Sequence, residues 1–137
     1  MATESEMRRQ ILDLQQSYED AKARNASILG KIETLENAKR HVDAAKGHVN
    51  DFKRGVKDIE FDGRWAGKRR NGADNGRDCV TEDADALAGA LGDLGWQLFC
   101  EIIGLRTQVD YLTLLMSNAE EGIEDLTRSI KELVDGD

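Results

Sequence analysis

The sequence contains no proline, and only 5% of its 137 residues are aromatic. Without proline, no long helix has to be interrupted, and with so few aromatic side chains a large globular core is disfavoured. Charged residues, by contrast, make up 34% of the chain. A proline-free, highly charged chain with periodic apolar residues is typical of long helices that pack as a coiled coil.

Long apolar runs are also missing. The first ten residues, MATESEMRRQ, contain no apolar segment of the kind found in signal peptides. The longest apolar runs, at residues 102–103 and 114–116, are too short to form a transmembrane helix. We therefore expect a cytoplasmic protein with no transmembrane segment, which would use a route without a cleaved signal peptide if it is exported.

Cysteine is scarce, with Cys79 and Cys100 as the two representatives. If residues 82–100 are helical, Cys100 lies roughly 30 Å along the axis from Cys79, at ~1.5 Å per residue. A disulfide needs Cα atoms within ~7 Å of each other. We expect two free thiols, with an intermolecular crosslink through Cys100 as the alternative.

Charge is unevenly distributed. Residues 81–137 contain 13 acidic and 3 basic residues, whereas residues 61–80 contain 3 acidic and 5 basic ones. An acidic helix of this kind repels phosphates, which argues against a nucleic-acid partner. The basic cluster is either a solvated loop or an electrostatic docking site for an acidic partner, and it consists of Lys68, Arg69, Arg70 and Arg77.

The first helix is predicted over residues 4–60. Thr3 and Glu6 form a capping-box pattern before it. Asn25 stands where an apolar residue is due, either as a tolerated polar layer or as a pin for the helix register. The apolar stripe, with a three-residue slip between Leu35 and Ala38, consists of Met7, Ile11, Leu14, Tyr18, Ala21, Ile28, Ile32, Leu35, Ala38, Val42, Ala45, Val49, Phe52, Val56 and Ile59.

The second helix is predicted over residues 82–135, with Thr81 as its N-cap and acidic residues in its first turn. Its stripe contains one step of four residues followed by another of four, from Leu94 to Leu98 to Ile102. The full stripe consists of Leu87, Leu91, Leu94, Leu98, Ile102, Leu105, Val109, Leu112, Met116, Ala119, Ile123, Leu126, Ile130 and Leu133.

Two amphipathic helices of similar length favour an all-α fold, a long antiparallel two-helix hairpin resembling a coiled coil. Residues 1–137 form one domain in this interpretation, with a turn at residues 61–80. Folding back at this turn would place Ile59 beside Leu87 and Met7 near Leu133. A parallel homodimer of continuous helices is the competing geometry, and the glycines of the turn argue against it.

The turn contains the sequence FDGRWAGKRR, with Phe61, Gly63, Trp65 and Gly67. The glycines allow backbone conformations that other residues avoid. Trp65 can close the end of the hairpin, with its indole N–H donating to a free helix carbonyl.

A helical hairpin with Trp65, Ala66 and Gly67 at its turn resembles the WXG-type small proteins of type VII secretion. The run LENAKRHVDAAKGHV followed by FDGRWAGKRR is most similar to the YwqH-like group associated with LXG toxins. The resemblance implies a non-enzymatic partner that binds and chaperones an LXG-type toxin, or a second small WXG-like protein, for export. The export signal of such systems, an aromatic residue followed four residues later by an acid, is not found. The residues four positions on are Lys22 after Tyr18, Val56 after Phe52, Ile103 after Phe99 and Leu115 after Tyr111.

A second apolar face on the second helix points away from its main stripe. Exposed apolar patches of this kind usually mark interaction sites, and small residues beside them allow another helix to approach closely. A homodimer and a heteromer both remain open, as does a self-associating scaffold module unrelated to secretion. The predicted interface consists of Gly89, Gly92, Gly95, Trp96, Phe99, Ile103 and Leu114.

Catalytic chemistry is not indicated by any motif. His41 and His48 lie two helical turns apart, ~10 Å, so they cannot share a metal ion. The glycines of the turn have neither of the two common phosphate-binding spacings. A two-helix hairpin also offers no concave site that excludes water. We therefore expect no catalytic, metal or cofactor site and no enzyme.

Overall fold

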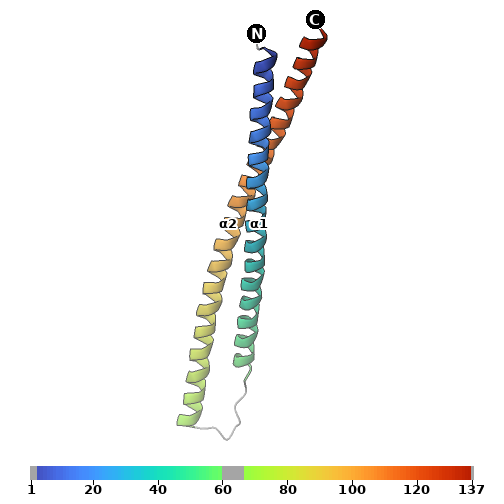
Figure 1. The fold of residues 1–137 in the computed structure, drawn as a ribbon. Coiled ribbons are helices and arrows are strands. Elements are labelled where there is room, and N and C mark those ends of the chain that lie inside the picture. The colour runs from blue at the N-terminus through green and yellow to red at the C-terminus, as the bar shows by residue number, and fades with distance from the viewer. Residues whose placement is uncertain (1–2, 60–66, 137) are drawn as a thin grey trace. The chain divides into compact units, whose positions relative to one another are not determined.

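The computed structural model is all-α, with two helices that pack against each other as a helical hairpin (Figure 1). It describes residues 3–59 and 67–136, with only the backbone of Lys68 and Arg69. Helix α1 spans Glu4–Lys57 and helix α2 spans Lys68–Asp135. The predicted fold class is confirmed.

The first turn of α1 forms the predicted capping box. The backbone N–H of Thr3 donates to Glu6 Oε2 at 3.2 Å, and the backbone N–H of Glu6 donates to Thr3 Oγ1 at 3.1 Å. Two donors that a helix start leaves without partners are thereby satisfied. At the other end, Arg54 and Lys57 in the last turn favourably oppose the negative end of the helix dipole.

Helix α2 begins at Lys68, so the predicted turn to residue 80 and helix start at residue 82 are wrong. Thr81 is not an N-cap, because its hydroxyl donates to the Arg77 carbonyl at 2.9 Å inside the helix. Asp74 stabilises this first part through ion pairs at helical spacing, 3.3 Å from Arg70 Nε and 3.2 Å from Arg77 Nη2. Glycines cost a helix only ~1 kcal/mol each, and no proline stops it.

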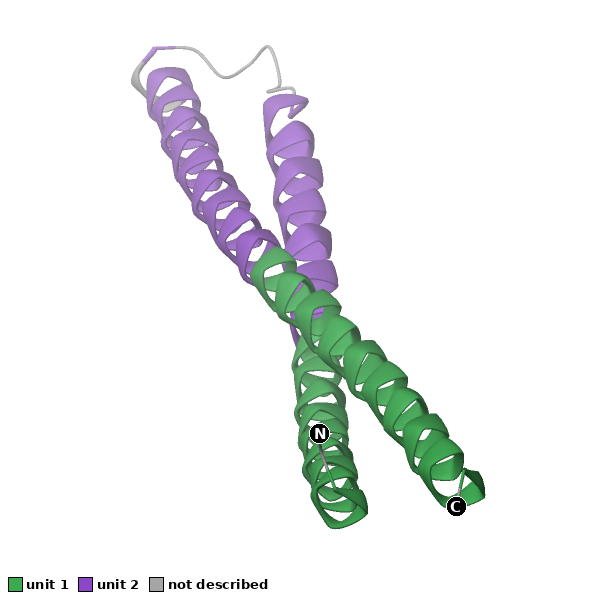
Figure 2. Ribbon diagram, turned by 90° about the horizontal axis from the view of Figure 1, so that it is seen from above, with its two compact units in different colours: residues 1–34, 102–137 green, residues 35–101 purple. Residues whose placement is uncertain are grey.

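The chain divides into two compact units, coloured in Figure 2. Unit 1 consists of Met1–Thr34 and Ile102–Asp137, and unit 2 consists of Leu35–Glu101. The boundary in α1 coincides with the predicted slip of the apolar stripe after Leu35. Each unit therefore contains one segment of α1 packed against one segment of α2.

The core of unit 1 follows the predicted stripes. Between these segments Gly122 approaches α1 so closely that a Cβ there would lie 2.9 Å from Leu14 Cδ1. The stripe ends earlier than predicted, because Ile130 is buried while Leu133 is 39% exposed. The buried hydrophobic residues of unit 1 are Met7, Ala21, Ile28, Ile32, Ile102, Leu112, Ala119 and Ile130.

The inner row of unit 2 consists largely of small residues. Gly95 is buried against α1, where a Cβ at this position would lie 3.8 Å from Val42 Cγ1. The predicted inward residues Leu87 and Leu94 are instead 51% and 43% exposed. With these corrections the less exposed residues of α2 keep a regular three- and four-residue spacing: Ala84, Ala88, Leu91, Gly95, Leu98 and Ile102. The predicted four-four step is therefore wrong.

The register of unit 2 also differs from the prediction. Arg77 Nη1 donates to the Ile59 carbonyl at 3.3 Å, so Ile59 lies opposite Arg77 and not beside Leu87. Lys53 forms an ion pair with Asp85. Lys53 is half-buried at this level, whereas the predicted stripe residue Phe52 is 59% exposed. The shift follows from the earlier start of α2, which brings residues 68–80 into the hairpin.

Candidate partner-binding surface

The turn motif lies mostly outside the described residues, which applies to Phe61, Gly63 and Trp65. Gly67 is described and adopts a φ of 68° immediately before α2. This is a left-handed conformation that favours glycine. Closure of the hairpin end by Trp65 stays a prediction.

Arg77 supplies a contact that sequence reasoning assigned to the Trp65 indole. Its guanidinium donates to the carbonyl of Ile59, just beyond the C-terminal end of α1. Carbonyls at a helix C-terminus lack intrahelical partners, and cationic side chains are favourable there. This role of Arg77 was not predicted, because the residue was assigned to a loop, although the sequence shows a basic residue near the hairpin end.

The basic cluster is partly engaged within its own helix. Arg70 and Arg77 both contact the carboxylate of Asp74. The side chains of Lys68 and Arg69 lie outside the described residues. Docking of this cluster on an acidic partner therefore stays a prediction, with part of its charge already opposed by Asp74.

Trp96 and Phe99 form the aromatic edge of a groove in unit 2. Their ring centroids lie 5.6 Å apart with an interplanar angle of 32°. Trp96 is 65% exposed and Phe99 is 38% exposed, so the predicted exposure of both side chains is confirmed. The groove has a volume of about 340 Å³, and we call it the Trp96 groove; it is lined by Lys39, Asp43, Lys46, Gly92, Gly95, Trp96 and Phe99.

The three predicted interface glycines have different surroundings. A Cβ at Gly92 would lie 3.2 Å from Lys46 Nζ, and one at Gly95 would lie 3.4 Å from Asp43 Oδ1. These two glycines therefore face α1 of the same chain. They allow α1 to approach closely, and not a partner helix as predicted. Nothing described lies within 4 Å of a Cβ at Gly89. Gly92 and Gly95 also line the Trp96 groove.

The remaining predicted interface residues, Ile103 and Leu114, belong to unit 1. They are 44% and 57% exposed, so their predicted exposure is confirmed. Tyr111 and Leu115 on the same helix segment are also exposed, at 61% and 40%. Unit 1 thus has an apolar surface of its own on α2.

Unit 2 has a second apolar surface that the sequence analysis missed. Val80, Leu87 and Leu94 are all exposed and recur every seven residues along α2. Leu87 and Val80, together with Phe52, Asp83 and Ala84, line a groove of about 230 Å³. The seven-residue repeat was visible in the sequence, but Leu87 and Leu94 were assigned to the inner stripe.

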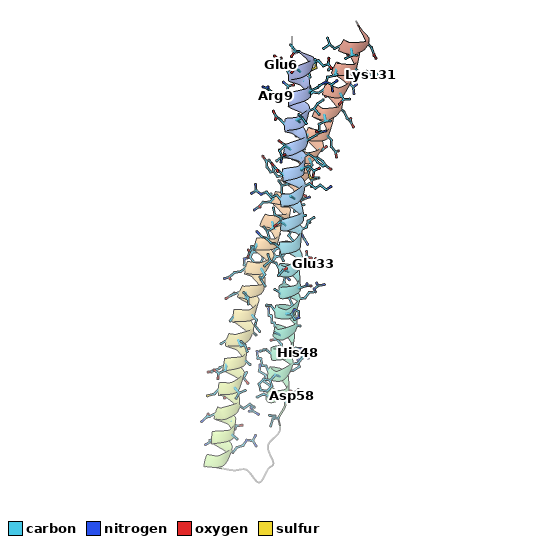
Figure 3. The ribbon with its side chains drawn as sticks, in the orientation of Figure 1. Glu6, Arg9, Glu33, His48, Asp58 and Lys131 are labelled. Atoms are coloured by element: carbon cyan, nitrogen blue, oxygen red, sulfur yellow. The ribbon has the colours of Figure 1, made fainter. Side chains whose placement is uncertain are left out.

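Titratable side chains do not gather into a metal site within residues 3–59 and 67–136. His41 Nδ1 lies 2.8 Å from the Asn37 carbonyl, on its own helix. Cys79 and Cys100 are exposed free thiols on α2, as predicted. Several exposed polar side chains are labelled in Figure 3: Glu6, Arg9, Glu33, His48, Asp58 and Lys131. The absence of enzymatic activity stays a prediction.

Helix α2 contains one apolar stretch between Arg70 and Asp135. An 18-residue window there has a mean hydropathy of 1.2, and 17% of it is buried. Its length and composition are those of a membrane span, but core helices of soluble proteins meet the same criteria. The predicted absence of a transmembrane segment is therefore not tested.

Comparison with known proteins adds no relative, since no protein-family model, curated protein or solved structure matches the chain.

Proposed function

We propose that the chain is a non-enzymatic helical partner protein of type VII secretion. In this role it binds an LXG-type toxin, or a second small WXG-like protein, and accompanies it for export. The support is the resemblance of the turn sequence to the YwqH-like group, together with a hairpin that exposes apolar surface.

The observation that carries the proposal is the difference between the two units. Of nine buried hydrophobic residues among those described, eight belong to unit 1 and only Ala84 belongs to unit 2. A contiguous exposed apolar patch usually marks an interaction site. Among the described residues, unit 2 exposes nearly as many large hydrophobic side chains as unit 1, seven against eight, but has only Ala84 among the buried hydrophobic residues. The seven are Phe52, Ile59, Val80, Leu87, Leu94, Trp96 and Phe99. A partner helix would give unit 2 the core that it lacks.

The contact would follow the helix-in-groove mode of recognition. An amphipathic helix of the partner lays its apolar side chains against Trp96 and Phe99 and excludes water from them. Each aromatic side chain buries ~150–250 Å² when covered, which makes Trp96 the expected anchor of the interface.

The test is co-expression with the N-terminal helical domain of an LXG toxin encoded beside this chain. We expect a heteromer on a sizing column. Trp96→Asp should weaken binding by at least about 30-fold, because a buried anchor typically contributes 2 kcal/mol or more. Helicity by circular dichroism should be unchanged, since the Trp96 side chain is 65% exposed in the hairpin.

The matched control is Tyr111→Asp, which introduces the same charge at an exposed aromatic residue of unit 1. It should leave toxin binding largely intact. A chain that forms a stable dimer and ignores the toxin domain would instead support the scaffold function. Full binding by the Trp96→Asp variant would remove this surface from the proposal.

A further inference from the structure

We propose that the Trp96 groove of unit 2 receives the outer face of residues 111–125 from a second copy of this chain. The inference does not depend on the type VII secretion role. It rests on the apolar and charged groups that line the groove and on a helix face that matches them.

The groove selects for a particular kind of helix. Trp96 and Phe99 offer an apolar surface along one edge, and Gly92 and Gly95 leave a hollow beside it. Lys39, Asp43 and Lys46 of α1 also line the groove, and Asp43 pairs with Lys39. A fitting occupant needs a bulky apolar side chain for the hollow and a carboxylate for the ammonium groups.

Unit 1 presents such a face on α2. Tyr111 and Leu114 are 61% and 57% exposed, and Leu115 beside them is 40% exposed. Further along the helix the same face becomes polar and then acidic. Its members are all exposed and alternate at spacings of three and four residues: Tyr111, Leu114, Asn118, Glu121 and Asp125.

The distances along the helices agree with one orientation. If the incoming helix runs antiparallel to α2 and Leu114 covers Trp96, Glu121 lies ~10.5 Å further along the axis, in the direction of Gly92. Gly92 lies ~6 Å from Trp96 on this axis, and Lys46 Nζ would be 3.2 Å from a Cβ there. The remaining offset of ~4.5 Å is within reach of the two long side chains of Lys46 and Glu121. Lys39 already pairs with Asp43 at 2.8 Å, so the exposed Lys46 is the cation that meets Glu121.

Each chain carries both halves of this contact, the groove in unit 2 and the acidic face in unit 1. The contact is heterologous, joining different surfaces of two copies. It covers Trp96, so a different partner at the same groove would have to displace the second copy.

The test is a charge-swap experiment on the full chain, followed by sedimentation equilibrium. The wild type should show a concentration-dependent mass above the 15.2 kDa of one chain. Lys46→Glu and Glu121→Lys should each weaken association by about tenfold or more, because like charges then face each other. The double variant restores an opposite pair, and its association should recover most of the loss.

Matched controls are Lys31→Glu on α1 and Glu132→Lys on α2, both exposed positions outside the proposed contact. They change net charge equally and should leave association unchanged. Circular dichroism must show that every variant keeps its helicity. A wild type that stays at 15.2 kDa at the highest concentration measured would overturn the proposal.

Two further results would also overturn it: association that neither single reversal weakens, and a double variant that recovers nothing. Failure here is distinguishable from failure of the proposed function. A monomer that binds the toxin domain refutes only the self-association, and a self-associating chain that ignores the domain refutes only the secretion role.

Discussion

Asn25 is a polar residue within the inner row of α1. Its Oδ1 is buried and has no hydrogen-bond partner among the described residues. A buried acceptor without a partner typically costs about 1–3 kcal/mol. The sequence leaves two interpretations open, a tolerated polar layer and a register pin, and this loss of stability is compatible with both. Only a register pin explains why a destabilising residue would stand there, because a buried Asn disfavours other helix registers.

Replacing Asn25 with leucine should therefore stabilise the hairpin. We expect Asn25→Leu to raise the free energy of unfolding by about 1–2 kcal/mol, because it removes the unsatisfied acceptor and adds apolar contact. Urea unfolding measures the change. Asn50→Leu, at an exposed position of α1, should have little effect, and a loss of stability in Asn25→Leu would show that Asn25 has a partner in solution.

Adjacent isoleucines in unit 1 offer a second comparison at residue scale. Ile102 is 3% exposed and Ile103 is 44% exposed. Ile102→Ala should cost about 2–4 kcal/mol through lost burial and the cavity it leaves. Ile103→Ala should cost less than about 1 kcal/mol, as expected for a surface position. Equal losses in thermal unfolding would contradict the observed rotation of α2.

At the scale of elements, the inner row of α2 determines how the helices meet in unit 2. Small residues, among them Ala84 and Gly95, occupy this row and let α1 come close. The larger side chains of Leu87 and Leu94 are thereby rotated outward, where they form a surface with Val80. The rotation of α2 about its own axis thus determines both which residues pack against α1 and which apolar residues are exposed.

Engineered disulfides test this rotation. In a chain with both native cysteines replaced by serine, Val42→Cys with Gly95→Cys should crosslink on oxidation, because a Cβ at Gly95 lies 3.8 Å from Val42 Cγ1. Val42→Cys with Leu94→Cys should not, since Leu94 points outward. The mass loss of two hydrogens in an intact-protein spectrum reports the bond. Crosslinking through residue 94 in preference to residue 95 would show that Leu94 points inward, as in the predicted spacing of Leu94, Leu98 and Ile102.

Two glycines of α2 in unit 1, Gly104 and Gly122, allow a further comparison of paired substitutions. A Cβ at Gly104 meets nothing within 4 Å, whereas one at Gly122 meets Leu14 Cδ1 at 2.9 Å. Gly104→Ala should stabilise the chain by about 0.5–1 kcal/mol through helix propensity. Gly122→Ala should gain less or lose stability, because Leu14 must move. Chemical denaturation distinguishes the two, and an equal gain would mean that the helices are farther apart in solution.

Periodicity predicted the fold class and most of the core of unit 1, because large aliphatic residues such as Ile28 and Leu112 leave little choice of inward face. It failed in unit 2, where Leu94 and Gly95 compete for one position and hydropathy favours leucine. Glycines also suggested a turn through residue 80, although ion pairs of Asp74 stabilise a helix there. The exposed side chains of the candidate surface were predicted, but the lysines of the Trp96 groove depend on the register between the helices.

At the scale of the whole molecule, the two units differ in how much apolar area they bury. Of the nine buried hydrophobic side chains among the described residues, eight belong to unit 1. Regions with few buried apolar contacts open at lower free energy. We therefore expect unit 2 to be the part of the chain that opens first.

Native-state hydrogen exchange measures this difference. Amides of α1 around Ile28 and of α2 around Leu112 should exchange more slowly than amides around Val49 and Leu91. Binding of a toxin domain at the Trp96 groove should slow exchange in unit 2 selectively, whereas self-association should also slow exchange around residues 111–125 of unit 1. Equal protection of both units in the isolated chain would show that unit 2 is as stable as unit 1 without a partner helix.

The division into units also orders events during translation. Residues 35–101 are contiguous, whereas unit 1 joins the two ends of the chain. The contact between Leu14 and Gly122 closes a far longer loop than the pair of Lys53 and Asp85, and closure becomes less favourable as loops lengthen. Met7 and Ile28 are therefore expected to stay uncovered until residues 102–135 have left the ribosome. A message truncated before that segment would release a product whose amino-terminal helix is open to chaperones and proteases.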